Sequence, residues 1–165
     1  MKNLVLLLLF IVSFGYSQND IVNLTDQPFL TEIIEIGLDE MNITSATVII
    51  KELKSKPKSV STRYGTYNET FAFIRSSYLR KDQGKFVIYI QKLREKTAIK
   101  ILSHELIHLN QYYTRNLMVS GQRVIFDGKY YKHVTNEDYK YRAWEIEANR
   151  LSLDLFVKIM KKYKK

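Results

Sequence analysis

Residues 94–113 constrain the fold of this chain more than any other segment. Their apolar side chains cover most of the circumference of a helix: Ala98, Ile99, Ile101, Leu102, Leu106, Ile107 and Leu109. A helix that is apolar nearly all round is a buried one. We therefore expect this segment to form a buried helix.

Three ionisable residues within this segment, His104, Glu105 and His108, form the pattern H-E-x-x-H. Residues four apart share a helix face, so the two imidazoles can bind one zinc ion at roughly 2.0–2.1 Å. Glu105 borders this face and can contact a metal-bound water without binding the metal. The alternative is a histidine pair satisfied in a core or at a surface. Burying each of these polar side chains without a partner would cost roughly several kcal/mol of folding free energy. A bound metal would provide the missing partner. The motif therefore predicts one zinc ion per chain.

A third protein ligand is expected downstream, because a catalytic zinc site usually has three ligands and an open position. The candidates are His133, Glu137, Asp138, Glu145 and Glu147. Glu145 and Asn149 are four apart and share a helix face, whereas Glu147 points about 200° away from Glu145. We predict Glu145 as the ligand, with His133 as its main competitor, and Glu147 in solvent or paired with Arg150. Asn149 is expected to hydrogen bond to the outer nitrogen of a ligating histidine.

These motifs resemble those of the gluzincin metallopeptidases, which include thermolysin. In that family H-E-x-x-H is followed, after a few dozen residues, by E-x-x-x-D on a second helix. The resemblance covers residues 100–154 and implies that Glu145 is the third ligand and that Asn149 supports the first histidine. Asn in place of Asp is a departure, because an amide accepts a hydrogen bond but brings no charge. Residues 104–111 read H-E-L-I-H-L-N-Q, which is similar to small gluzincin-like domains with H-E-x-x-H-x-x-Q.

The resemblance implies a zinc endopeptidase in which Glu105 is the general base that takes a proton from a zinc-bound water. A donor must also stabilise the oxyanion, and Tyr141, His133 and Gln111 are the candidates for oxyanion or substrate contacts. In the family an extended substrate pairs with an edge strand, and residues 85–90 are either that strand or a buried central one. Two alternatives stay open. One is a non-catalytic zinc-binding module, or a degenerate peptidase, that binds a protein partner, and the other is a zinc hydrolase acting on a non-peptide bond.

The remaining patterns predict an α+β fold with a small antiparallel or mixed sheet and a long C-terminal helix, and the resemblance implies that this fold is zincin-like. Residues 31–41 read as a helix and residues 55–68 as a loop. Strands are expected over residues 47–53, 70–79 and 86–90, the last two as a hairpin, and within 117–133 around a turn at Asp127 and Gly128. Asn136 is expected to cap a final helix that runs to about residue 162.

The N-terminal residues have the layout of a secretory signal peptide. Lys2 precedes an apolar run over residues 4–14 and the small residues Gly15 and Ser17, so cleavage after Ser17 is expected. A membrane anchor is the alternative, but the run holds about 11 residues and a spanning helix needs roughly 20. The expected product is a single exported domain, residues 18–165, located in the periplasm or outside the cell.

Composition narrows the classes of partner. The chain has no cysteine, which excludes a disulfide and a lipoprotein anchor. Its formal net charge is +9, but the lysines are scattered and their densest cluster ends the final helix, where cations complement the helix dipole. No recognised nucleic-acid-binding motif is present. We therefore expect a peptide or protein substrate, no nucleic acid, and no stable membrane anchor after signal cleavage.

Overall fold

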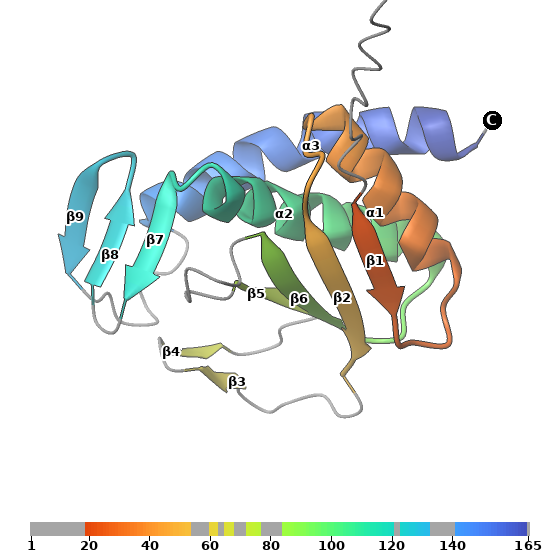
Figure 1. Ribbon diagram of the computed structural model, residues 1–165, viewed down its shortest axis with the longest axis horizontal. Helices are drawn as coiled ribbons and strands as arrows, with labels where there is room; N and C mark the ends of the chain where they lie inside the picture. Colours follow the sequence, from red (N-terminus) through yellow and green to blue (C-terminus); the bar gives the residue numbers. More distant parts are fainter. Residues whose placement is uncertain are drawn as a thin grey trace, which may run out of the picture.

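The computed structural model of the chain has an α+β fold, in which helices lie on one side of a small mixed sheet (Figure 1). The residues that the structure describes are 19–53, 60–62, 65–67, 72–76, 84–120, 123–132 and 141–164. The predicted signal peptide lies outside these residues. Within them, none of the helices combines the length and the apolar character needed to cross a membrane.

The described helices are α1 (Phe29–Glu40), α2 (Glu95–Tyr113) and α3 (Ala143–Tyr163). The predictions of α1, of the buried α2 and of a long C-terminal helix are confirmed. The predicted start of the final helix is wrong, because α3 begins at Ala143 and the extended residue Arg142 is its N-cap. Asn136 lies outside the described residues and too far upstream to cap this helix. Asparagine favours helix N-caps, but the apolar periodicity begins only at Trp144.

The main sheet has the strand order β1-β2-β6-β5. Its strands are β1 (Asp20–Asn23), β2 (Thr47–Glu52), β6 (Lys85–Ile90) and β5 (Ala72–Ser76). The first three run parallel, and β5 is antiparallel to β6, as expected for the predicted hairpin. Of the two interpretations of residues 85–90, the edge strand is wrong and the central strand is correct. The described edge strand beside α2 is β5.

Two smaller sheets complete the described strands. β3 (Val60–Thr62) and β4 (Gly65–Tyr67) pair within the segment predicted as a loop. β7 (Leu117–Ser120), β8 (Arg123–Phe126) and β9 (Lys129–Lys132) form an antiparallel meander at one end of the molecule (Figure 1). Asp127 and Gly128 have positive φ angles in the β8–β9 turn, as the sequence predicts. The meander packs against Trp144 and so supports the first turn of α3.

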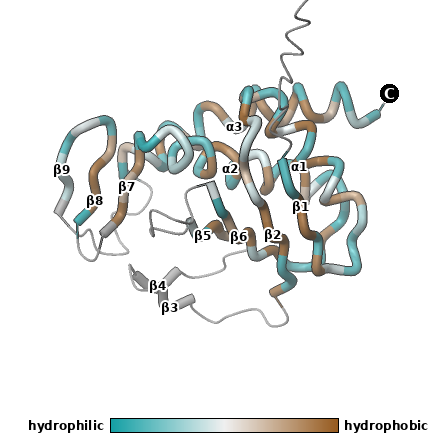
Figure 2. The backbone as a smooth tube through the Cα atoms, viewed as in Figure 1, coloured by the Kyte–Doolittle hydropathy of each residue, from teal (hydrophilic) through white to brown (hydrophobic). Residues whose placement is uncertain are grey.

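The main core lies between the helices and the sheet. In Figure 2 hydrophobic residues gather along β2 and β6 and where the helices face them. α2 packs against α1, α3 and β5. At the crossing of α1 and α2, a Cβ added at Gly37 would lie 2.5 Å from Leu106 Cδ1. Gly37 therefore lets α1 lie close to Leu106, the residue that follows Glu105 of the H-E-x-x-H motif.

Candidate metal site

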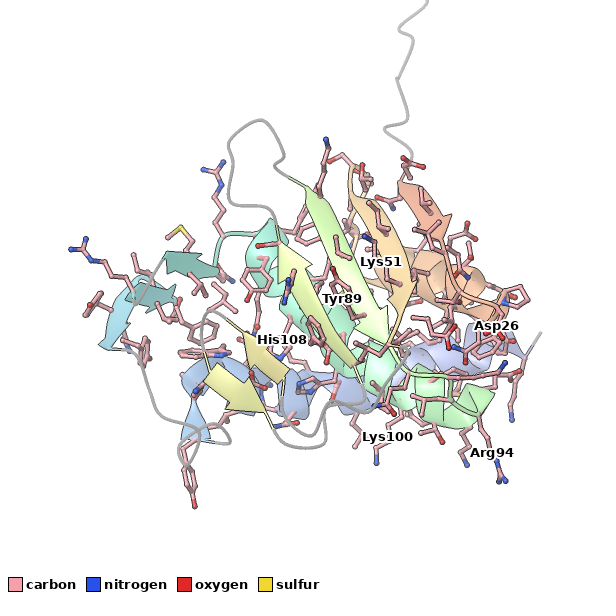
Figure 3. The ribbon with its side chains drawn as sticks, turned by 90° about the horizontal axis from the view of Figure 1, so that it is seen from below. Asp26, Lys51, Tyr89, Arg94, Lys100 and His108 are labelled. Atoms are coloured by element: carbon pink, nitrogen blue, oxygen red, sulfur yellow. The ribbon has the colours of Figure 1, made fainter. Side chains whose placement is uncertain are left out.

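The side chains of His104 and His108 from α2 and of Glu145 from α3 converge on one point. His104 Nε2 lies 3.1 Å from His108 Nε2, and Glu145 Oε2 lies 3.4 Å and 3.3 Å from these two nitrogens. Their ligand atoms all lie within 4.8 Å of one another, so these three residues could hold a metal ion. We call His104, His108 and Glu145 the metal group. In Figure 3 His108 is seen near the middle of the molecule.

Helix geometry places the three side chains. His104 and His108 are one turn apart on α2, and α2 packs along α3, which carries Glu145 in its first turn. A carboxylate in the first turn is favoured by the positive end of the helix dipole. The side chain of His104 is 23% exposed, whereas that of Glu145 is 5% exposed. The site is therefore buried on the Glu145 side and reaches solvent on the His104 side.

Glu105 lies beside this group without belonging to it. Burial raises the pKa of the Glu105 carboxyl above its ordinary range, and the neighbouring His108 and His104 partly oppose the shift. The backbone N–H of Ile74 in β5 also hydrogen bonds to Glu105 and favours its ionised form. Glu105 is therefore a buried carboxyl that lies between the candidate metal ligands and the edge strand β5.

The pKa of His108 is raised to about 9. Burial alone would lower this pKa, but the carboxylates of Glu145 and Glu105, together with the Gln111 side chain, favour the imidazolium more strongly. A histidine must be deprotonated at the nitrogen that binds a metal. Metal binding at this site therefore has to displace a proton from His108.

Metal-free and metal-loaded protein should respond to pH in opposite directions. His108 has a folded-state pKa above its ordinary 6.5, so its contribution to stability is complete below pH 6.5 and is lost as pH rises through about 9. The pKa of Glu105 is also raised, so its contribution has the same sign and begins to fall above its ordinary value of 4.5. Metal affinity should instead increase over this range, because protons compete less for the ligands. Urea unfolding from pH 6.5 to 9, with a chelator and with zinc, would test this. Metal-free stability that rises with pH would contradict it.

Gln111 is placed differently from the prediction. It is 2% exposed, so it does not face the open side of the site as a substrate or oxyanion contact would. Its Oε1 lies 2.8 Å from His108 Nδ1, and its Nε2 donates hydrogen bonds to the Trp144 carbonyl and to Glu147. Glu147, which we predicted to meet solvent or to pair with Arg150, is partly exposed and accepts this hydrogen bond from Gln111. The sequence feature that indicates the contact between Gln111 and His108 is their spacing of three residues on one helix.

Asn149 does not contact the histidines as predicted, and Tyr141 precedes the helix in which it was predicted to lie. Asn149 is exposed, and within the described part of the chain no hydrogen bond joins its side chain to either histidine. Gln111, and not Asn149, holds the outer nitrogen of His108. Tyr141 is 66% exposed and precedes α3, so helical spacing does not place it over the metal group. His133, Glu137 and Asp138 lie outside the described residues.

Comparisons with known proteins give no further information about this site. Comparisons of the chain with protein families, with curated proteins and with solved structures found no match.

Proposed function

We propose that the chain is an exported, gluzincin-type zinc metallopeptidase. The observation that carries the proposal is the convergence of His104, His108 and Glu145, with Glu105 buried beside them. Two imidazole nitrogens and one carboxylate oxygen are the ligand set of catalytic zinc in enzymes such as thermolysin. The partial exposure of His104 leaves one side of the group accessible to water and substrate.

The candidate site would supply the metal ligands and the general base of a hydrolytic site. A bound zinc ion would lower the pKa of its water to about 7 and polarise the substrate carbonyl. His104, His108 and Glu145 would hold it, and Glu105 would accept the proton of the attacking water and return it to the leaving amine. The oxyanion donor is left to Tyr141 or His133, since Gln111 is buried.

The fold supports a peptide as the substrate. β5 is the described edge strand on the side of α2, and its Ile74 backbone contacts Glu105. An extended peptide can add to an exposed strand edge through main-chain hydrogen bonds. We therefore assign to β5 the substrate-pairing role that the family resemblance gives to an edge strand, in place of β6.

Hydrolysis of an unstructured protein by purified residues 18–165, loaded with one equivalent of zinc, tests the proposal. New N-termini in the products would show endopeptidase activity, and a chelator should stop it. Zinc binding without cleavage would indicate a non-catalytic module. Turnover of esters or amides without any protein cleavage would indicate a hydrolase of another class.

Export makes a separate prediction. The apolar run that ends before Gly15 is too short to span a membrane, and small residues precede Gln18. Protein recovered from outside the cytoplasm of the producing cell should therefore begin at Gln18. N-terminal sequencing of that fraction decides it, and an intact Met1 in the membrane fraction would contradict it.

A further inference from the structure

Gln111 joins the two helices that carry the metal group. It follows His108 by three residues on α2, and its amide nitrogen lies 3.0 Å from the backbone oxygen of Trp144 and 2.8 Å from Glu147 Oε2. Trp144 and Glu147 flank Glu145 in the first turn of α3. The buried Gln111 side chain thus contacts His108 of the metal group and two residues close to Glu145 in the sequence, one on each side of it.

The partners of Gln111 determine which way its amide points. An amide nitrogen has two N–H donors, whereas an amide oxygen only accepts. The Trp144 carbonyl and the ionised Glu147 carboxylate also only accept, so both N–H groups must face them. A flipped amide would place Oε1 against two acceptors in a buried position, which costs free energy. Oε1 is therefore directed at His108 Nδ1, 2.8 Å away.

The same reasoning extends to the histidine. Because Oε1 can only accept, Nδ1 of His108 must carry the proton of this hydrogen bond, and the neutral ring then has its lone pair on Nε2. Nε2 is the atom that lies 3.1 Å from His104 Nε2 and 3.3 Å from Glu145 Oε2. We propose that Gln111, oriented by Glu147 and Trp144, is a positioning residue that holds His108 in the tautomer able to bind the metal. This inference rests on the metal site of the proposed function.

Replacement of Gln111 by Leu should weaken zinc binding about 10- to 100-fold, as loss of a partner to a metal-binding histidine typically does. Gln27 provides a matched control. It is 4% exposed, accepts a hydrogen bond from the backbone N–H of Leu93, and lies before α1. Gln27→Leu removes a buried glutamine elsewhere in the fold and should leave zinc affinity within about twofold. Both variants would be compared by chelator competition and by urea unfolding.

An exchange of the two partners gives a more specific test. Gln111→Glu alone would place a carboxylate oxygen against Glu147 and should bind zinc more weakly than the parent. Adding Glu147→Gln restores a donor opposite that oxygen, while the Trp144 carbonyl still faces it. The double variant should therefore bind zinc more tightly than Gln111→Glu, by up to about tenfold, the effect of one such partner. Urea unfolding of the same variants without zinc separates the two roles, because a merely structural role would change the stability of the metal-free fold together with zinc affinity.

Long-range proton–nitrogen NMR of the zinc-loaded parent reads the tautomer directly and needs no variant. The expected spectrum shows a proton on Nδ1 of His108 and zinc on Nε2. Zinc bound to Nδ1, or an affinity unchanged by Gln111→Leu, would overturn this inference alone. A parent chain that binds no zinc would overturn the proposed function as well, so the two failures are distinguishable.

Discussion

Glu105→Gln is expected to keep its zinc and to lose about 100- to 10,000-fold in the rate of peptide hydrolysis. Glu105 is buried beside the metal group and is not one of the three residues whose ligand atoms converge. The amide has nearly the same size, so α2 and the ligands should stay in place. It cannot accept the proton of the attacking water, so the step that generates the nucleophile is lost.

The measurement combines initial rates on an unstructured protein with elemental analysis of each preparation. Glu35→Gln is the matched control, because Glu35 is exposed on α1 and takes no part in the site. It should keep both zinc and the parental rate. Loss of zinc in Glu105→Gln would make Glu105 a ligand, and a parental rate with zinc bound would exclude it as the base.

The helices could be predicted from the sequence because their signals are local. The apolar circumference of residues 94–113 predicts a buried α2, and the spacing of His104 and His108 already determines that they share a face. β1 was missed because Asp20–Asn23 is short and partly exposed. It becomes a strand through parallel pairing with β2, whose paired residues lie 27 positions downstream. The central position of β6 is also a property of strand order, which local alternation does not encode.

The residues that hydrogen bond to the candidate metal ligands could not be predicted from local sequence patterns either. Asn149 and Gln111 both have a spacing compatible with contact to the metal group, four residues from Glu145 and three from His108. Which of them meets a histidine depends on how α2 crosses α3, and the meander that packs on Trp144 contributes to that arrangement. Periodicity within one helix cannot reveal the rotation of one helix against another. The sequence therefore predicts the metal group better than it predicts the side chains behind it.

Loss of two metal ligands is the second change for which we expect a large effect, here on zinc binding. Replacing both His104 and His108 by Ala is expected to abolish zinc binding, since one carboxylate then remains of a three-residue group. Zinc that binds only the folded state stabilises it by about 2.7 kcal/mol at 100 times the Kd, so this variant should also lose the zinc-dependent rise in unfolding temperature. Unchanged zinc content in the double variant would exclude the site.

Glu145→Ala distinguishes the third ligand from its neighbours. Glu145 Oε2 lies within 3.4 Å of both imidazole nitrogens, whereas Glu147 reaches the site only through Gln111. Glu145→Ala should therefore weaken zinc binding by more than the roughly 10- to 100-fold typical of losing an outer partner. Glu147→Ala should stay at or below that range, because the Trp144 carbonyl still orients the Gln111 amide. His133→Ala completes the set, and all three variants are measured by the same chelator competition.

If Glu145→Ala bound zinc as tightly as the parent while either other variant lost it, Glu145 would not be the ligand. The metal would then have to lie away from the point where α2 and α3 meet.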